Sequence, residues 1–376
     1  MNLGIYVHIP FCVSKCLYCN FYSENKLEYI NDYVLALVKE IKRDSKLYNK
    51  YSIDTIFIGG GTPSILPAGC ITLIINAIKE NYNVLPDCEI TIEANPNSIN
   101  YTNAAEWLSA GVNRVSVGLQ TTSNRLLKII GRAHTHQDFL NAISDLKNVG
   151  FTNINADIMI GLPMQKQNEL KSTLRQCFGM GLTHISAYTL ILEENTPLCG
   201  LVQQKKIKLP TEDKTVNMFK YLLKQTAFNG YNRYEVSNFA REGYECKHNK
   251  NCWNMVPYVG FGCAAHSFFE KNRFGNISNI VKYIDLINNN KSVRDFNEQI
   301  SDAELIEETI MLGLRTTNGI NLKKLKQQFN YDLRKVKAAE ISELKQLGLI
   351  KLENGFLFAT TEGFYVLNQI ILKLVD

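Results

Sequence analysis

The chain has 376 residues, of which 45% are hydrophobic and 20% charged, an ordinary globular composition that allows a sizeable core. Its formal net charge of +5, from 41 basic and 36 acidic residues, is a mild excess, far from the clustered basicity of a dedicated nucleic-acid-binding protein. No apolar run approaches the roughly 20 residues that a membrane-spanning helix needs, so we do not expect an integral membrane protein.

The N-terminal residues and the cysteine usage both predict a cytoplasmic protein. MNLGIYVHIPF runs directly into a strand-like pattern, without the charged segment and the cleavage site of a signal peptide. Ten cysteines are present, and seven of them are scattered over the chain, at positions 70, 88, 177, 199, 246, 252 and 263. Scattered cysteines in a long chain suit a reducing compartment better than a secreted disulfide framework.

Strands and helices alternate up to about residue 240. The expected strands are 4–11, 54–64, 89–96, 114–120, 153–163, 184–191 and 232–239. The expected helices include 27–48, 70–82, 103–111 and 136–150, the last two closed by glycine. This alternation gives about six β–α units and predicts an α/β fold with a parallel sheet.

The C-terminal part has a different pattern. Residues 301–376 indicate several helices followed by a hairpin about an Asn354–Gly355 turn, an arrangement similar to a winged-helix domain. Six Lys or Arg residues fall within 321–340, and we interpret this run as the solvated face of a helix, so nucleic-acid binding is not expected. Residues 268–300, rich in Asn and Lys, are expected to form a connector.

The first candidate site lies in HIPFCVSKCLYCNFYS, residues 8–23, where Cys12, Cys16 and Cys19 form a CxxxCxxC pattern. Three thiols could give a disulfide with one cysteine left over, a zinc site short of a ligand, or an iron–sulfur cluster with one iron open. No second CxxC pair completes a zinc site, and His8 lies on a strand in an awkward direction for a fourth ligand. The ligand count therefore favours the iron–sulfur cluster.

The second candidate site lies at the ends of the predicted strands. In IFIGGGTPS, residues 56–64, three glycines would let the backbone approach a ligand closely, although a tight turn alone could also explain them. Glu93, Gln120 and Asp157 lie in or at the end of successive strands, and Arg132 follows Gly131 in GRAHTHQ. A buried charge is costly unless paired, and barrels place their active sites at the carboxyl ends of strands. We therefore predict that these four side chains meet.

Six motifs together carry a resemblance to a known family. YVHIPFCVSKCLYC, GGGTP, IEANP, SVGLQ, GRAHT and DIMIGLP resemble, in family order, the radical S-adenosylmethionine (SAM) enzymes of the coproporphyrinogen dehydrogenase-like group. The resemblance implies a partial (βα)6 TIM-like barrel, with a 4Fe–4S cluster on Cys12, Cys16 and Cys19 and SAM on the fourth iron. It further implies contacts to SAM from Tyr6, Tyr18, Gly60, Gly61, Thr62, Glu93, Gln120, Arg132 and Asp157. In this group the cluster cleaves SAM to a 5′-deoxyadenosyl radical.

Two features separate the branches of this group. Its coproporphyrinogen oxidases resemble CxxxCxxCxC and carry a long N-terminal extension. Here Phe21 stands where the fourth cysteine is expected, and only eleven residues precede Cys12. Both features resemble the haem chaperone branch.

The segment HNKNCW resembles the HNxxYW signature that is associated with haem binding in that branch. His248, Asn249 and Trp253 match the signature, and Cys252 departs from it. The resemblance implies that these three residues bind haem and that His248 is the iron ligand. A loop histidine with a hydrogen bond to the backbone is the alternative interpretation, and Cys246 and His266 are second-choice ligands.

The predicted organisation is a radical SAM barrel over 1–240, a haem-signature segment with a connector over 241–300, and a winged-helix-like, mostly helical domain over 301–376. The resemblance implies a haem chaperone that binds haem, a 4Fe–4S cluster and SAM and hands haem to an acceptor protein, for example a membrane-bound respiratory enzyme. A reductant protein such as a flavodoxin would supply electrons. The alternative function is oxygen-independent coproporphyrinogen III oxidation, so the question whether the protein is an enzyme stays open.

Overall fold

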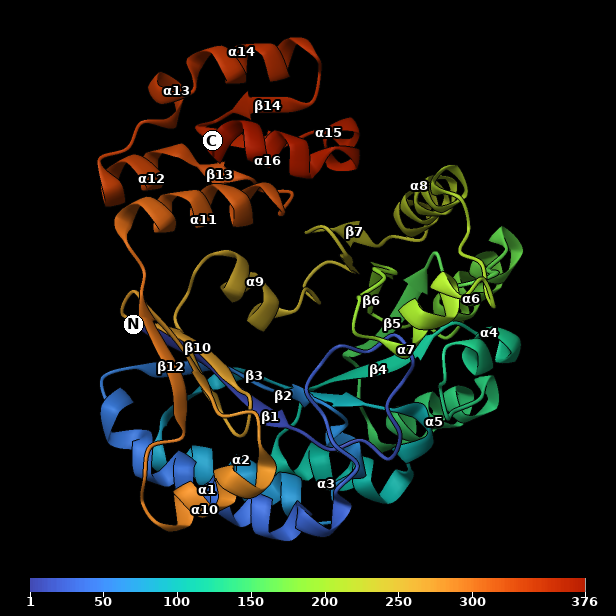
Figure 1. Cartoon of the computed structure of the whole chain (residues 1–376), viewed down its shortest axis with the longest axis vertical. Coiled ribbons are helices and arrows are strands. Elements are labelled where there is room, and N and C mark those ends of the chain that lie inside the picture. The colour runs from blue at the N-terminus through green and yellow to red at the C-terminus, as the bar shows by residue number, and fades with distance from the viewer. Residues whose placement is uncertain (376) are drawn as a thin grey trace.

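The computed structural model describes residues 1–375 and places twelve of its strands in one curved sheet with helices on its outer face (Figure 1). The strand order is β12-β11-β10-β9-β1-β2-β3-β4-β5-β6-β8-β7. The strands of the first half are β1 Asn2–Ile9, β2 Ser52–Gly60, β3 Asn83–Ala94, β4 Arg114–Gln120, β5 Ile154–Ile160 and β6 His184–Thr189. The remaining strands of this sheet are β7 Asn232–Arg233, β8 Asn238–Ala240, β9 Tyr258–Phe261, β10 His266–Phe269, β11 Asn272–Asn276 and β12 Arg294–Gln299.

The helices that accompany this sheet follow the strands in turn. They are α1 Ile30–Asp44, α2 Cys70–Asn81, α3 Tyr101–Ala110, α4 Asn124–Ile129, α5 His136–Val149, α6 Gln167–Gly179, α7 Pro197–Gln203, α8 Glu212–Phe228, α9 Lys247–Trp253 and α10 Ile280–Asn288. Short 3₁₀ turns occupy Leu27–Tyr29, Ser45–Tyr48, Pro63–Ile65 and Pro96–Ser98. Local chemistry fixes several ends: Thr135 and Asp138 form a capping box that begins α5, and Gly150 ends it with a φ of 114°.

The strands β1 to β6 lie side by side in chain order and run parallel. On β1 the side chains of Leu3, Ile5 and Val7 are fully buried in the main core, which the surrounding helices share. Side chains alternate along a strand, so Gly4, Tyr6 and His8 face the concave side. This arrangement confirms the predicted α/β, partial TIM-like barrel.

The sheet differs from the sequence prediction at two places. Residues 232–239, expected as one strand, form β7 and β8, and β8 pairs antiparallel with β6. The buried Glu235 carboxylate accepts a hydrogen bond from the backbone N–H of Ser237 (3.2 Å), which stabilises a turn between them. Residues 268–300, expected as a connector, instead contribute β10, β11, α10 and β12, which extend the sheet beyond β9. β9 pairs parallel with β1.

The last segment forms a second core above the barrel (Figure 1). It comprises α11 Asp302–Leu314, β13 Ile320–Asn321, α12 Leu322–Phe329, α13 Leu333–Val336, α14 Ala338–Gln346, β14 Ile350–Glu353, β15 Phe356–Ala359, α15 Thr361–Tyr365 and α16 Leu367–Val375. The predicted hairpin is confirmed: β14 and β15 flank Asn354 and Gly355, which both have positive φ, as a type I′ turn requires. Among the described residues, no helix combines the length and the hydropathy needed to span a membrane.

Candidate functional site

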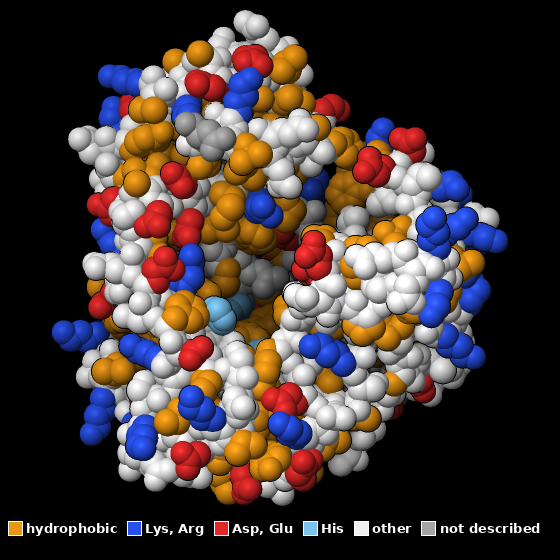
Figure 2. Space-filling model, viewed as in Figure 1, with side chains coloured by type: hydrophobic (Ala, Val, Ile, Leu, Met, Phe, Trp, Pro, Cys, Tyr) orange, Lys and Arg blue, Asp and Glu red, His pale blue; other side chains and the backbone are white. Residues whose placement is uncertain are grey.

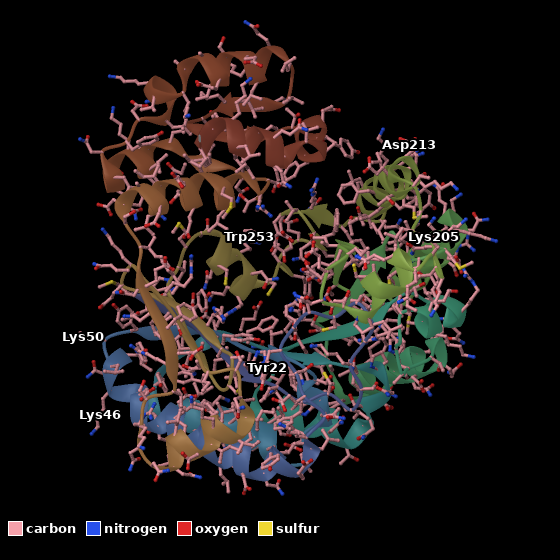
Figure 3. All side chains as sticks on the ribbon, in the orientation of Figure 1. Tyr22, Lys46, Lys50, Lys205, Asp213 and Trp253 are labelled. Atoms are coloured by element: carbon pink, nitrogen blue, oxygen red, sulfur yellow. The ribbon has the colours of Figure 1, made fainter. Side chains whose placement is uncertain are left out.

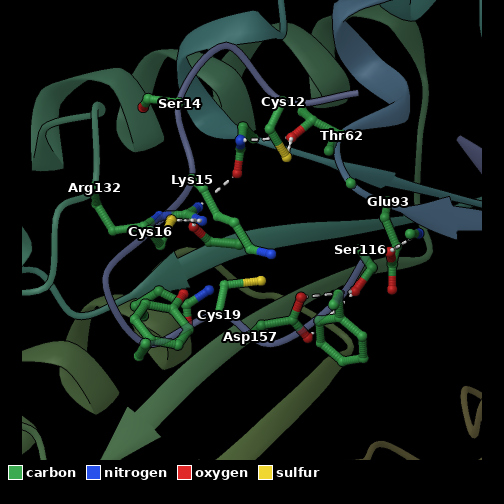
Figure 4. Close-up of a pocket in the computed structure, with 18 of the residues that line it drawn as sticks. Cys12, Ser14, Lys15, Cys16, Cys19, Thr62, Glu93, Ser116, Arg132 and Asp157 are labelled. Carbon is green, nitrogen blue, oxygen red and sulfur yellow. Dashed lines mark hydrogen bonds between the residues drawn. The ribbon is translucent and has the colours of Figure 1, made fainter. Parts of the chain in front are cut away.

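A cavity of about 370 Å³ lies at the carboxyl ends of the parallel strands (Figure 4). The loop after β1 supplies one wall, and the ends of β2 to β6 supply the other. The sequence-predicted residues that line this cavity are Cys12, Cys16, Tyr18, Cys19, Gly60, Gly61, Thr62, Glu93, Gln120, Arg132 and Asp157. The fold therefore brings these residues together in one cavity, although they are up to 145 positions apart in the sequence.

Backbone hydrogen bonds hold the cysteine loop in place. The N–H of Cys12 donates to the carbonyl of Glu24 (3.0 Å), and the N–H of Glu24 donates to that of Pro10 (2.8 Å). Further along, the N–H of Leu17 donates to Ile130 O, 3.0 Å away, which ties the loop to the end of α4. The loop is thus anchored at both its base and its tip without any bound group.

The three cysteines are free thiols around one opening (Figure 4). Cys12 Sγ lies 3.4 Å from Thr62 Oγ1, and Arg132 Nη1 donates to Cys16 Sγ at 3.6 Å. Burial raises the pKa of the Cys19 thiol. Within residues 1–375, no three Cys, His, Asp or Glu side chains are placed to share a single metal ion. A cubane makes a different demand, because each of its thiolate ligands binds its own iron atom.

His8 has no free ring nitrogen to offer a metal. Its Nε2 lies 3.0 Å from the carbonyl oxygen of Tyr22, and its Nδ1 lies 2.8 Å from the hydroxyl of Tyr6. Burial lowers its pKa to about 4, so the ring is neutral near pH 7. The imidazole acts as a brace between β1 and the far end of the cysteine loop.

Two half-buried carboxyl groups, Glu93 on β3 and Asp157 on β5, stand on the cavity wall with β4 between their strands. Burial, with a smaller contribution from Asp157, raises the pKa of Glu93 to about 7. The N–H of Gly60, which donates to Glu93 Oε2 at 3.1 Å, lowers this pKa and only partly offsets the effect of burial. Burial also raises the pKa of Asp157, although Asn155 and Ser116 donate to its carboxylate at 2.8 and 3.1 Å. Arg114 acts on both carboxyl groups only at longer range, and no ion pair within residues 1–375 includes either of them, so both are suited to bind a cationic or hydroxyl-bearing ligand.

Arg132 and Gln120 are held in defined positions opposite the cysteines. Arg132 Nη2 donates to Asn95 Oδ1 and to Gly118 O, both at 2.6 Å. Gln120 has a φ of 62°, a left-handed conformation that is uncommon for a residue other than glycine and is enriched at functional sites. The sequence pattern identified both residues but could not foresee this conformation.

The glycine run has a structural explanation as well as a possible ligand contact. A Cβ on Gly60, whose φ is 111°, would lie 2.6 Å from the His8 ring, and one on Gly61 would lie 2.6 Å from Phe11 O. The glycines are therefore required by the neighbouring β1 segment. They also line the cavity, and a contact to a ligand there stays a prediction.

A second cavity, of about 450 Å³, lies on the other side of the cysteine loop. Its lining comprises Tyr6, His8, Asn20, Phe21, Tyr22, His248, Cys252, Tyr258, Ala264, His266 and Ser278. Figure 2 shows a hollow in this face of the molecule with histidine side chains at its edge, and Figure 3 locates Tyr22 and Trp253 around it. Phe21 lines both cavities. Tyr6, grouped with the SAM residues from sequence, lines the second cavity instead of the first.

His248 lies at the start of α9 with its ring over the sheet. Its Nδ1 lies 2.9 Å from Thr55 Oγ1, and its ring stacks on that of Phe57, with centroids 5.1 Å apart. Burial lowers its pKa to about 4, so the imidazole is neutral. Among the described residues, no hydrogen-bond partner is found for Nε2. A histidine held through one ring nitrogen and open at the other has the arrangement of a metal ligand.

The rest of the signature segment divides between two faces of α9. Cys252, four residues after His248, shares its face and lines the second cavity. Asn249 and Trp253 lie on the adjacent face, are half-buried, and line neither cavity. Of the second-choice ligands, the exposed His266 lines the second cavity. Cys246 is fully buried and donates to Glu89.

Glu89 on β3 fixes the position of α9. Its two carboxylate oxygens accept hydrogen bonds from the backbone N–H groups of Lys247 (2.8 Å) and His248 (3.0 Å). Asn251, one turn further along, donates to the buried Asp54 at 3.1 Å. Helix α9 is therefore tied to the sheet at both of its turns.

Comparisons with known proteins decide the family. Residues 6–177 match the family model of the Radical SAM superfamily, and residues 300–366 match that of the HemN C-terminal domain. The heme chaperone HemW of Lactococcus lactis subsp. lactis (strain IL1403) is 33% identical over 371 residues, covering 98% of this chain and 96% of that protein. The chain belongs to the HemW family of radical SAM proteins. The heme chaperone HemW of Bacillus subtilis (strain 168) is 32% identical over 370 residues, 97% of each chain.

Membership in the HemW family implies a 4Fe–4S cluster and SAM. Coproporphyrinogen III oxidase (HemN) from Escherichia coli, a solved structure, matches with a TM-score of 0.86 and 20% identity, covering 100% of this chain and 90% of that one. At this identity the match shows the fold alone. The relatives that match over nearly their whole length are named heme chaperones, and together with the Radical SAM match they favour the chaperone branch over the oxidase.

Sequence reasoning missed several residues of the first cavity. Lys15, Asn95, Ser116 and Tyr188 also line it. Asn95 belongs to the IEANP motif, and Ser116 lies four residues before Gln120 on the same strand, so period-two alternation would have placed it on the same face. For Lys15 and Tyr188 no local signal distinguishes a cavity residue from a surface one.

Proposed function

We propose that this protein binds haem in the second cavity and delivers it to an acceptor protein. The observation that carries the proposal is His248: a neutral, buried imidazole lines this cavity, Thr55 holds its Nδ1, and its Nε2 has no partner among the described residues. Neutral imidazole nitrogen is the usual haem-iron ligand. The aromatic rings of Tyr6, Phe21 and Tyr258 in the same lining suit a flat macrocycle.

We further propose that the first cavity holds the 4Fe–4S cluster and SAM. The donor set supports this: Cys12, Cys16 and Cys19 offer three sulfur ligands around one cavity, and Arg132 Nη1 donates to Cys16 Sγ at 3.6 Å. The cluster, when bound, supplies the low-potential electron that cleaves the sulfonium bond of SAM.

The opposite wall suits the polar parts of SAM. The carboxyl groups of Glu93 and Asp157 would receive its ammonium and ribose hydroxyl groups, and the cationic Lys15 and Arg132 would attract its carboxylate. Tyr18, Gln120 and the Gly60–Thr62 segment complete the proposed contacts. Hydrogen bonds to Asn95 Oδ1 and Gly118 O hold the Arg132 guanidinium in place on this wall.

The partners follow from the same proposal. We propose a cytoplasmic protein that receives electrons from a reductant such as a flavodoxin. We also propose a haem-accepting protein, for example a membrane-bound respiratory enzyme, as its partner. Asn249 and Trp253 do not line the cavity. We therefore propose that they contact the acceptor protein or the edge of the haem.

Anaerobic reconstitution with iron and sulfide, followed by haem titration with and without SAM, tests the proposal by absorbance. We expect saturable binding near one haem per chain. The variant His248→Ala should lose most of the affinity, whereas His136→Ala, on α5 at the outside of the barrel, should bind as the wild type does. Stoichiometric haem in His248→Ala would overturn the ligand assignment. Conversion of coproporphyrinogen to protoporphyrinogen by the reconstituted protein with SAM and a reductant would instead favour the oxidase function.

A further inference from the structure

The second cavity lacks a partner for the acidic part of haem. Haem carries two propionate chains, and these carboxylates are usually met by cationic side chains. None of the described residues that line the second cavity is Lys or Arg. A haem bound there by His248 alone would leave both carboxylates without a charged partner in that cavity.

An adjoining cavity supplies one cation. It has a volume of about 190 Å³ and shares Cys252 and Tyr258 with the second cavity. Its wall also contains Arg273 on β11 and Glu308 on α11. The two side chains form a bidentate ion pair, with Arg273 Nη1 2.9 Å from Glu308 Oε1 and Nη2 3.0 Å from Oε2. This pair joins the barrel sheet to the C-terminal unit.

The sheet register places this guanidinium on the same face as the proposed haem ligand. Arg273 pairs with Phe268, Phe268 with Tyr258, and Tyr258 with Gly4. Directly paired residues project to one face of a sheet, and the His248 ring lies over that of Gly4, where an added Cβ would be 3.4 Å from Cε1. Three strand spacings, about 14 Å, therefore separate the two ends of this row. A tetrapyrrole with its propionate chain and an extended arginine side chain can cover that span together.

We propose that Arg273 binds a propionate carboxylate of haem and that this propionate displaces Glu308, which releases the ion pair between the sheet and α11. The proposal rests on haem binding in the second cavity. The pair is well placed for such an exchange, because both acceptors are carboxylates and the side chains of Arg273 and Glu308 are 37% and 19% exposed. Haem binding is thereby coupled to the attachment of the C-terminal unit.

Titration with haem and with haem dimethyl ester, whose propionates are blocked, tests the exchange. The wild type should bind haem about tenfold more tightly than the ester, the size expected for one charge-assisted contact at a partly exposed site. Arg273→Gln should abolish this preference by weakening haem binding only. Glu308→Gln, which frees the guanidinium, should tighten haem binding severalfold and leave ester binding unchanged.

Asp302→Asn is the matched control. It removes another ion pair between the barrel and α11, Lys271 Nζ to Asp302 Oδ1 at 2.6 Å, without altering Arg273. Its haem affinity should equal that of the wild type. Equal affinities for haem and ester in the wild type, or no gain in Glu308→Gln, would refute the exchange while leaving the proposed function intact. Absence of saturable binding of either ligand would overturn the proposed function and, with it, the exchange.

Hydrogen exchange gives a second readout that does not depend on the affinity of Arg273→Gln. In the wild type, haem should accelerate amide exchange in α11, and the ester should not. Glu308→Gln should show fast exchange in α11 already without ligand. Haem that binds with unchanged exchange in α11 would refute the release of the C-terminal unit.

Discussion

Replacing Glu89 with glutamine tests how the proposed haem ligand is positioned. Glu89 accepts hydrogen bonds from the first two N–H groups of α9, the helix that carries His248. It also lies within electrostatic reach of Arg114, which is 2% exposed and whose Nε has no hydrogen-bond partner among the described residues. The substitution keeps the size of the side chain but removes its charge from both the helix and the arginine.

Two costs should add in this variant. Loss of a carboxylate at a partly buried helix N-terminus costs about 1 kcal/mol. Glu89 acts on Arg114 through space rather than through a direct ion pair, so removing this charge costs about 2 kcal/mol, less than the loss of a direct buried partner, and Asp157 also acts on Arg114. We therefore expect Glu89→Gln to lower the free energy of unfolding by about 3 kcal/mol, a large part of the ~5–15 kcal/mol typical of a domain.

Urea unfolding measures this loss, and a double-mutant cycle separates its two parts. Arg114→Met removes the buried cation, so the double variant should be more stable than additivity predicts by about 1–3 kcal/mol. Glu106→Gln is the control: Glu106 likewise contacts the start of a helix, through Gly69 N at 3.0 Å, and should lose only about 1 kcal/mol. Additive effects within about 0.5 kcal/mol, or equal losses in both glutamine variants, would refute the pairing of Glu89 with Arg114.

Three further predictions follow from other buried groups. Burial raises the pKa of Glu40 from 4.5 to about 7, so the folded state binds a proton that the unfolded state has already lost over this pH range. The free energy of unfolding of the wild type should therefore fall between pH 4.5 and pH 7. This fall should be about 3 kcal/mol larger than in Glu40→Gln, which has no carboxyl group to titrate. Urea unfolding at several pH values measures this difference, and an equal change of the free energy of unfolding with pH in both proteins would contradict it. Thr55→Val should weaken haem binding about 10–100-fold in a titration, whereas Thr91→Val, whose buried hydroxyl has no partner in the described chain, should not. Cys16→Ser should lose reconstituted iron by metal analysis; equal iron in Cys16→Ser and the control Cys70→Ser would exclude Cys16 as a ligand.

Local patterns were sufficient to predict the first half of the fold. The alternation of Leu3, Ile5 and Val7 with Gly4 and Tyr6 identifies one buried face of β1, and similar runs recur at regular intervals between helices. Parallel strands joined by helices bring their carboxyl ends to one edge, so polar residues there were expected to meet. This physical rule is why the first cavity could be assembled from sequence.

The remainder depends on pairings that have no local signal. β9 pairs with β1, from which it is separated by about 250 residues of sequence. β12, RDFNEQ, is exposed along its whole length. The sequence of neither strand therefore indicates which strand it pairs with. The pairing of β9 with β1 brings Tyr258 to the second cavity, which Tyr6 and His8 of β1 also line. Tyr6 was therefore assigned to the first cavity, although it shares a face of β1 with the residues that line the second.

The boundary between the two cavities gives a physical reason for a phenylalanine at position 21, where the resemblance places a cysteine in the oxidase branch. Phe21 is two residues beyond Cys19, lines both cavities, and is 71% exposed. A cysteine there would present a reactive thiol beside the three cluster thiols. The phenyl ring instead gives the second cavity an apolar wall directly behind the cysteine loop, where a flat macrocycle gains contact area. Phe21 thus leaves one thiol fewer beside the first cavity than the CxxxCxxCxC pattern would and adds an aromatic surface to the second cavity, which supports the haem site proposed there.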